Sequence, residues 1–192
     1  MPTIPLRVIL VSVCILLCGG CISSSSQESG GNIQITGNNT TEFNISVTGL
    51  AEESHLPAEY TCINLGKNPE ISWTGAPEGT RSFVFILDDP DAPSGVFTHW
   101  IIYNISPESH AIHGGQVSGT TKSANGIQGL NSIGTSGYYP PCPPSGPGHR
   151  YIFSLYALDT LLDITRGDRE EIDSKMNGHI LDTAKLVTLF ER

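Results

Sequence analysis

The run FVFILDDPDAP, residues 83–93, decides the fold because it joins an apolar strand to a rigid acidic turn. Phe83 to Leu87 is continuously apolar and rich in residues that favour strands, which predicts a buried central strand. Proline fixes its own φ angle and restricts the residue before it, so Asp89 and Asp91 flank a turn of limited freedom. The run therefore holds ionisable side chains at the end of a core strand before any ligand binds.

A second segment repeats this arrangement downstream. The run GYYPPCPP occupies residues 137–144, and His149 and Tyr151 then open another apolar stretch. His99 and Trp100 follow the first turn in the same way. Two histidines that open strands after proline-rich loops, each with an aromatic residue within two positions, favour one shared site. Acids and imidazoles that converge there would form a small polar pocket able to hold an anion.

The rest of the chain predicts an all-β protein in a single domain, because short apolar segments alternate with turns rich in Gly and Pro. Strands are expected at residues 43–48, 83–87, 100–105, 151–158 and 186–190. One helix is expected near the C-terminus, capped by Asp168. The apolar face of that helix would comprise Ile172, Lys175, Met176, His179 and Ile180. This pattern favours a two-sheet β-sandwich.

Charge and the N-terminus predict an exported protein that does not bind nucleic acid. The formal net charge of −9 disfavours nucleic acid and anionic bilayers as partners. Residues 1–20 combine Arg7 with an apolar stretch that is short for a membrane span, and they are interpreted as a signal peptide. The run LCGGC at residues 17–21 resembles a lipobox, so Cys21 is the expected lipidation site. An ordinary signal peptide and an uncleaved anchor are the alternatives.

Residues 21–42 are expected to form a flexible tether, and residues 43–192 the folded domain. The domain would then sit on the outer face of the cell membrane, attached through the lipidated Cys21. Cys62 and Cys142 are the cysteines left in the domain. In an oxidising compartment they form either a disulfide or two separate buried thiols.

Both proline-rich blocks strongly resemble those of the phosphatidylethanolamine-binding protein family, also called Raf kinase inhibitor protein-like. The resemblance runs from about Phe43 to the C-terminus and is closest to the compact bacterial and archaeal members. It includes YTC at 60–62, SWTGAP at 72–77 and LYALD at 155–159. The resemblance implies two packed antiparallel sheets with Greek-key connections, here with one short C-terminal helix.

The resemblance also implies a set of ligand-binding residues. Asp89 would point into the pocket, His99 and His149 would form its walls, and Tyr151 would contribute its hydroxyl. The residues expected to support the pocket are Asp91, Pro93, Trp100, Gly137 and Pro141. Protonated imidazoles and the phenol can donate hydrogen bonds to an anion, and the backbone at 134–137 could add donors. Arg150 lies between His149 and Tyr151, so it is expected to face the opposite side of the strand.

The leading interpretation is an extracytoplasmic binding or inhibitory module that recognises phosphate- or carboxylate-bearing groups. Its partner would be a small anion, a phospholipid head group or a protein target. The alternative is a hydrolase that uses Asp89, His99 and His149, with or without a zinc ion. No nucleophile lies in a recognised activating motif, so no catalytic residue, cofactor or metal is assigned. A cell-surface structural domain with a vestigial pocket is the third interpretation.

Overall fold

The computed structural model describes residues 42–64, 66–115, 125–165 and 167–192. These residues all belong to one compact unit, Asn39–Arg192, of the two into which the chain divides. The expected signal peptide, Cys21 and nearly all of the expected tether lie outside the described residues. Among the helices of the described ranges, none is long and apolar enough to cross a membrane.

Two antiparallel sheets form the described part of the chain, which confirms the predicted all-β fold. The smaller sheet has the order β1-β2-β5, with β1 at Asn44–Val47, β2 at Ile71–Thr74 and β5 at Ala111–Ile112. The larger sheet has the order β6-β4-β3-β7-β8. Its strands are β6 at Ile127–Gln128, β4 at Phe97–Ile105, β3 at Ser82–Asp89, β7 at His149–Leu158 and β8 at Ile180–Phe190. The chain crosses between the sheets after β2, β4 and β5.

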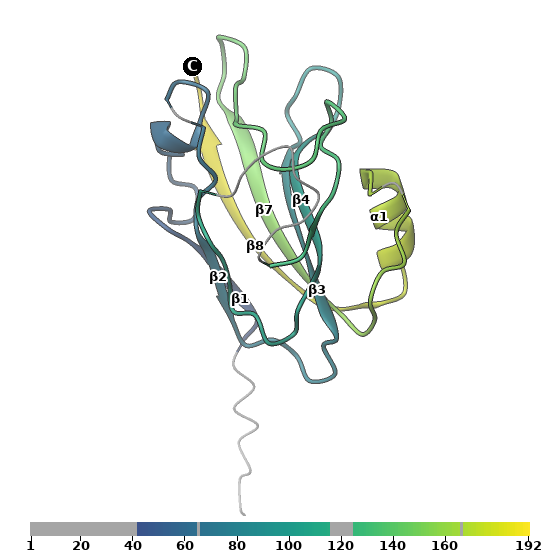
Figure 1. Cartoon of the computed structure of the whole chain (residues 1–192). Helices are drawn as coiled ribbons and strands as arrows, with labels where there is room; N and C mark the ends of the chain where they lie inside the picture. Colours follow the sequence, from purple (N-terminus) through teal and green to yellow (C-terminus); the bar gives the residue numbers. More distant parts are fainter. Residues whose placement is uncertain (1–41, 65, 116–124, 166) are drawn as a thin grey trace, which may run out of the picture. The chain divides into compact units, whose positions relative to one another are not determined.

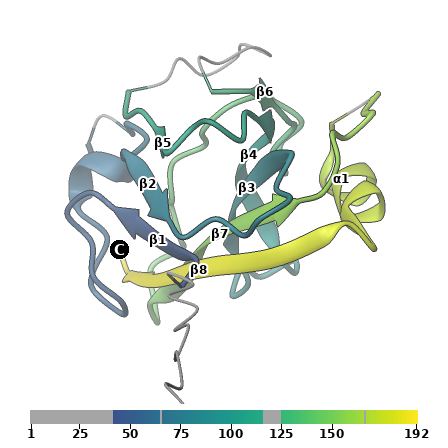
Figure 2. The same cartoon turned by 90° about the horizontal axis from the view of Figure 1, so that it is seen from below.

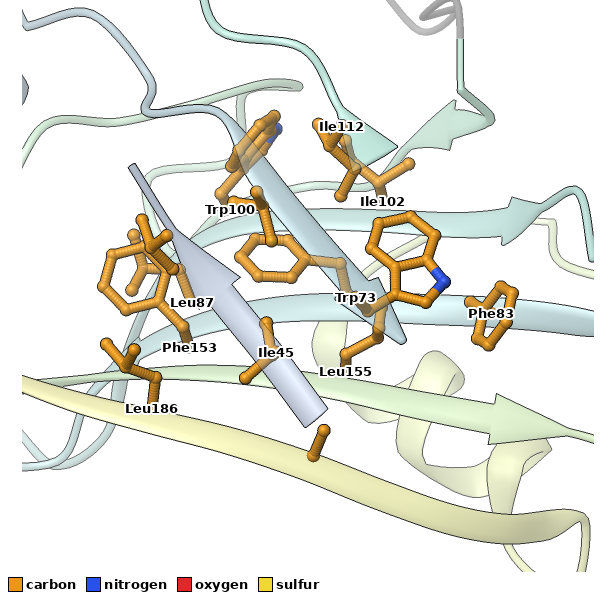
Figure 3. Packing of buried hydrophobic residues seen from close by; sticks show 14 of the residues in the cluster. Ile45, Trp73, Phe83, Leu87, Trp100, Ile102, Ile112, Phe153, Leu155 and Leu186 are labelled. Atoms are coloured by element: carbon orange, nitrogen blue, oxygen red, sulfur yellow. The ribbon is translucent and has the colours of Figure 1, made fainter. Parts of the chain in front are cut away.

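The larger sheet is apolar on both faces, as the unbroken run in β3 predicts. Phe83, Phe85 and Leu87 belong to the cluster between the two sheets, whereas Val84 and Ile86 belong to a second cluster with residues of α1 (Arg169–Met176). Figures 1 and 2 show β1 and β2 on one side of this sheet and α1 on the other. Figure 3 shows labelled side chains of the first cluster, which come from both sheets. Strands covered on both faces lack the alternation of a half-exposed sheet.

The helix is shorter than the apolar pattern predicts. Asp168 caps α1 as expected, because its side chain accepts a hydrogen bond from the backbone N–H of Glu171. The helix then ends at Met176, and Gly178 adopts a left-handed conformation with φ of 83°. His179 and Ile180 therefore do not extend the apolar face of α1, and Ile180 begins β8 instead.

The strand predictions were correct for β1, β3, β4 and β7 apart from their ends, but the last strand is longer than expected. β8 begins at Ile180 rather than at residue 186, because it pairs with β7 along almost its whole length. Strands β2, β5 and β6 were not among the expected strands. The burial of β2 alternates along Ile71–Thr74, which is a signal that the sequence contained.

Replacing Asp168 with Ala should lower the free energy of unfolding by about 1 kcal/mol, because the first turn of α1 loses its side-chain acceptor. Asp163→Ala removes the same charge from an exposed position ahead of the helix and is the matched control. Urea denaturation followed by circular dichroism measures both variants. Equal losses of stability in the two would contradict the capping role.

Candidate ligand pocket

Neighbouring strands bring Asp89, His149 and Tyr151 to one end of the inner face of the larger sheet. β3 and β7 are antiparallel neighbours, and their register runs to the pair Asp88 and Ile152. Side chains alternate along a strand, so Asp89 lies on the same face as Leu87, and both residues of β7 lie on that face too. The site therefore continues the apolar core outward.

A β-bulge in β4 adds His99 to this group. Leu87 pairs with Trp100 and Asp88 pairs with Thr98, so His99 is an extra residue without a partner position on β3. Thr98 faces the helix side, where its hydroxyl donates to Asp88 Oδ1 at 2.8 Å. His99 and Trp100 can both lie toward the inner face, because the bulge interrupts the alternation between them.

Asp89 and His149 form a buried hydrogen-bonded pair at the floor of the site. His149 Nδ1 lies 2.7 Å from Asp89 Oδ2, and the residues are only 8% and 4% exposed. Asp89 Oδ1 accepts a second hydrogen bond from the backbone N–H of Asp91 at 2.9 Å. A carboxylate only accepts, so the proton of this bond lies on Nδ1 of His149. Nε2, on the other edge of the ring, has no partner in the described part of the chain.

His99 is held in a different way. Its Nδ1 lies 2.8 Å from the carbonyl oxygen of Tyr139, which only accepts, so Nδ1 carries the proton here as well. Burial lowers the pKa of His99 below its ordinary value, which favours the neutral ring. The neutral ring offers a lone pair at Nε2 instead of a proton. His99 therefore differs from the expectation that both histidines donate to an anion.

These residues border a pocket of about 250 Å³. One side is the acidic turn after β3, and the other is the proline-rich segment before β7. The lining comprises Asp89, Ala92, Pro93, Ser94, Phe97, His99, Tyr139, Cys142, Pro143, Pro144 and His149. The pocket thus combines two imidazoles and one carboxylate with aromatic and proline walls.

Tyr151 lies behind the pocket instead of lining it. Its side chain is fully buried, and its ring meets the ring of His99 edge-on, with centroids 5.4 Å apart. Its hydroxyl makes no hydrogen bond of standard geometry within the described residues. Burial, together with the nearby charge of Asp89, raises the pKa of Tyr151. The phenol is therefore a neutral group beneath the pair formed by Asp89 and His149.

Trp100, Gly137 and Pro141 also lie outside the lining. The Trp100 indole is buried in the core, where its N–H donates to Gln128 Oε1 at 2.9 Å. Gly137 accepts from Asn131 through its carbonyl, and Pro141 accepts from the backbone N–H of Cys62. These three residues contribute to the surrounding structure and do not border the cavity. Pro93 does line the pocket, as expected.

Gly134 and Thr135 begin the glycine-rich segment before the proline run, and their backbone N–H groups do not donate into the pocket. The N–H of Gly134 donates to the carbonyl of Asn131, and the N–H of Thr135 donates to the Asn131 side chain. The expectation of an anion cradle at 134–137 is therefore wrong for these two amides, because they stabilise the turn itself.

Arg150 faces away from the pocket, as the strand alternation predicts, and binds Asp91. Its guanidinium contacts both oxygens of that carboxylate, at 2.7 and 2.9 Å, and its backbone N–H donates to Oδ2. These hydrogen bonds from Arg150 lower the pKa of Asp91 to about 2. Asp91 thus supports the pocket by joining the acidic turn to the start of β7.

Sequence reasoning missed several residues of the lining, notably Phe97 and Tyr139. The Phe97 ring contacts His99 with centroids 4.7 Å apart, and Tyr139 stacks on His99 at 6.1 Å. Phe97 lies two positions before His99, a spacing that would place it on the same strand face in a regular strand.

Groups of three or more His, Cys, Asp or Glu suited to a metal ion are absent from the described ranges.

Comparisons with known proteins match both the sequence and the fold. The family model for phosphatidylethanolamine-binding protein matches residues 46–191. A UPF0098 protein of Methanothermobacter thermautotrophicus is 43% identical over 151 residues, which cover 78% of this chain and 99% of that protein. A UPF0098 protein of Pyrococcus horikoshii is 38% identical over 188 residues, covering 96% of this chain and 88% of that protein.

Two solved structures share the architecture. A phosphatidylethanolamine-binding protein homolog from Chlamydia trachomatis aligns with a TM-score of 0.71 and 35% identity, covering 78% of this chain and 97% of that one. YbcL of E. coli, described as a member of the mammalian family, aligns with a TM-score of 0.73 and 26% identity, covering 79% and 99%. The chain belongs to the phosphatidylethanolamine-binding protein family.

Proposed function

We propose that this chain is an extracytoplasmic binding module whose pocket takes a small phosphate- or carboxylate-bearing group. The observation that carries the proposal is the pair of differently held histidines beside one cavity. The Asp89 carboxylate accepts a hydrogen bond from Nδ1 of His149, and the Tyr139 carbonyl accepts one from Nδ1 of His99. Because Nδ1 is used in each ring, Nε2 is left for a ligand.

The two ring nitrogens suit a ligand with both an acceptor and a donor. His149, once protonated at Nε2, donates a charge-assisted hydrogen bond to an anionic oxygen. Neutral His99 accepts a hydrogen bond at Nε2 from a P–O–H, an ammonium or a hydroxyl group. A phosphate ester that retains one proton and an ethanolamine phosphate head group both offer this combination. Two sources of such a phosphate group are a phospholipid head group and a modified protein side chain.

The location is proposed from the N-terminal sequence, with a signal peptide at 1–20 and lipidation at Cys21. The bond between Cys62 and Cys142 is compatible with an oxidising compartment outside the cytoplasm. In this proposal the domain binds its ligand at the outer face of the membrane that anchors it. Its net charge of −9 argues against nucleic acid as a partner.

A hydrolase is the second candidate, and one observation favours it. Ser94 lines the same pocket as the hydrogen-bonded pair of Asp89 and His149, and a serine, an imidazole and a carboxylate can act together as nucleophile, base and orienting group. Turnover of p-nitrophenyl phosphate or acetate that Ser94→Ala abolishes would establish this function. We expect no turnover above the buffer rate, since Ser94 lies on the turn without a hydrogen bond to His149 in the described part of the chain.

His149→Ala should weaken the binding of phosphoethanolamine by about ten- to a hundredfold, because a charge-assisted contact contributes roughly 1.5–3 kcal/mol. Calorimetric titration of the ligand into the full chain measures this change. His113→Ala is the matched control, since His113 is exposed and lies outside the pocket lining. Arg150→Ala should have a much smaller effect, because its guanidinium binds Asp91 on the opposite side of the strand. A large loss from Arg150→Ala with none from His149→Ala would overturn the proposed site.

His99 should titrate below its ordinary pKa of 6.5 in the folded chain, because burial disfavours the imidazolium. Between pH 6.5 and the lower pKa of folded His99, the unfolded chain then binds more protons than the folded chain. The stability contributed by neutral His99 is present above pH 6.5 and is lost as the pH falls from there through the folded-state pKa.

His99→Asn removes this titration and retains a side-chain N–H for the Tyr139 carbonyl. Between pH 6.5 and the folded-state pKa of His99, the free energy of unfolding of the variant should fall less steeply with decreasing pH than that of the original chain. The two slopes should differ by up to about 1.4 kcal/mol per pH unit. NMR titration of the ring protons and urea unfolding at several pH values measure the two effects. A His99 midpoint at or above 6.5 would contradict the assignment.

A further inference from the structure

One wall of the pocket is built from a segment that can make very few backbone hydrogen bonds. This proline wall comprises residues 139–144, and four of its six residues are prolines. Proline has no N–H, so only Tyr139 and Cys142 can donate from the backbone. Tyr139, Cys142, Pro143 and Pro144 nevertheless border the cavity. The wall must therefore be held by something other than a strand ladder.

The first attachment of the proline wall is to His99. The N–H of Tyr139 donates to the carbonyl of His99 at 2.9 Å, and His99 Nδ1 donates back to the carbonyl of Tyr139. This pair of bonds fixes the beginning of the wall to β4. It also ties the orientation of the His99 ring to the position of the wall.

The second attachment is at Cys142. A disulfide joins Cys142 to Cys62, with Cα atoms 5.4 Å apart, and the N–H of Cys62 donates to the carbonyl of Pro141 at 3.0 Å. From Cys142 to the start of β7 at His149, the described residues make no further backbone hydrogen bond. The disulfide is therefore the last attachment of the wall before the sheet resumes.

The partner cysteine belongs to a firmly held segment. Cys62 follows a 3-10 turn at Ala58–Tyr60, and the buried Thr61 donates to the carbonyl of Ala58 through both its N–H and its hydroxyl. The carbonyl of Tyr60 also accepts a hydrogen bond from the buried hydroxyl of Tyr138. The disulfide thus fastens the wall to a fixed point 80 residues away in the sequence.

The bond is also open to a reductant. Cys142 is exposed and Cys62 is partly exposed. Arg192 Nη1 lies 3.4 Å from the Sγ atom of Cys142. A neighbouring guanidinium stabilises a thiolate, so Cys142 is the better leaving group when a thiol attacks the sulfur of Cys62.

We propose that the Cys62–Cys142 disulfide positions the proline wall, so that ligand binding in the pocket depends on the redox state of this bond. The inference rests on the proposed binding function. Two electrons and two protons from a dithiol convert the bond to two thiols, and the dithiol becomes a cyclic disulfide. The wall beyond Pro141 then loses its covalent attachment. Pro143 and Pro144 no longer hold a fixed position against His99 and His149, and the ligand binds more weakly.

The test compares the oxidised full chain, the chain reduced with dithiothreitol, and the double variant Cys62→Ser, Cys142→Ser. Titration calorimetry with phosphoethanolamine should show at least tenfold weaker binding for the reduced chain and for the double variant. Amide hydrogen exchange supplies a second readout. Exchange at Cys62, whose N–H donates to the carbonyl of Pro141, should accelerate on reduction, while that of Phe153 in β7 should stay protected.

Arg192→Ala is the matched kinetic control. It keeps the disulfide and removes the guanidinium beside Cys142, so the oxidised variant should bind with unchanged affinity and be reduced more slowly. Equal affinity of the oxidised and reduced chains would overturn the proposal. Loss of protection at Phe153 on reduction would also overturn it, because the bond would then stabilise the whole domain. If the oxidised chain binds neither phosphate nor phosphoethanolamine, the proposed function fails, and the exchange data alone decide whether the bond positions the wall.

Discussion

The hydrogen bond between His149 Nδ1 and Asp89 Oδ2 is the interaction on which the rest of the site depends. Both residues are almost fully buried, and a buried carboxylate without partners would be very costly. The hydrogen bond from His149 offsets this cost. It can form because β3 and β7 are neighbours in the sheet, although the two residues are 60 positions apart in the sequence. Asp91 then donates to Asp89 and binds Arg150, which links the acidic turn to the same two strands.

The bulge at His99 resolves a conflict between packing and chemistry. Trp100 must face the core, where its ring packs edge-on against Phe85 with centroids 5.3 Å apart. In a regular strand its neighbour would face the helix side of the sheet. The extra residue in β4 places the His99 ring against Tyr151 and Tyr139 without moving Trp100 out of the core. One inserted residue thus serves the core and the pocket together.

Local patterns in the sequence predicted the central strands and the two turns that carry Asp89 and His149, because hydrophobic runs and prolines act over a few residues. The short strands β5 and β6 have two residues each and no such pattern. The bulge depends on pairing between β3 and β4, so no window around His99 reveals it. The resemblance implies that Tyr151 contributes its hydroxyl to the pocket, whereas its side chain lies behind the lining. Strand alternation gives its face correctly, but the depth at which its hydroxyl ends depends on residues from other strands.

The composition of the walls determines what kind of recognition the pocket can perform. Many phosphate sites use backbone N–H groups at a helix N-terminus or in a glycine-rich loop. Here one wall is rich in proline, and the amides of Gly134 and Thr135 are used within their own turn. In the proposed function, an anionic oxygen is therefore bound by Nε2 of His149, while Nε2 of His99 accepts from a donor on the same ligand. The cavity, at about 250 Å³, is smaller than most sites for whole small molecules, which span roughly 300–1,000 Å³. In the proposed function, a pocket of this size takes the charged end of a larger molecule, with the remainder of that molecule outside.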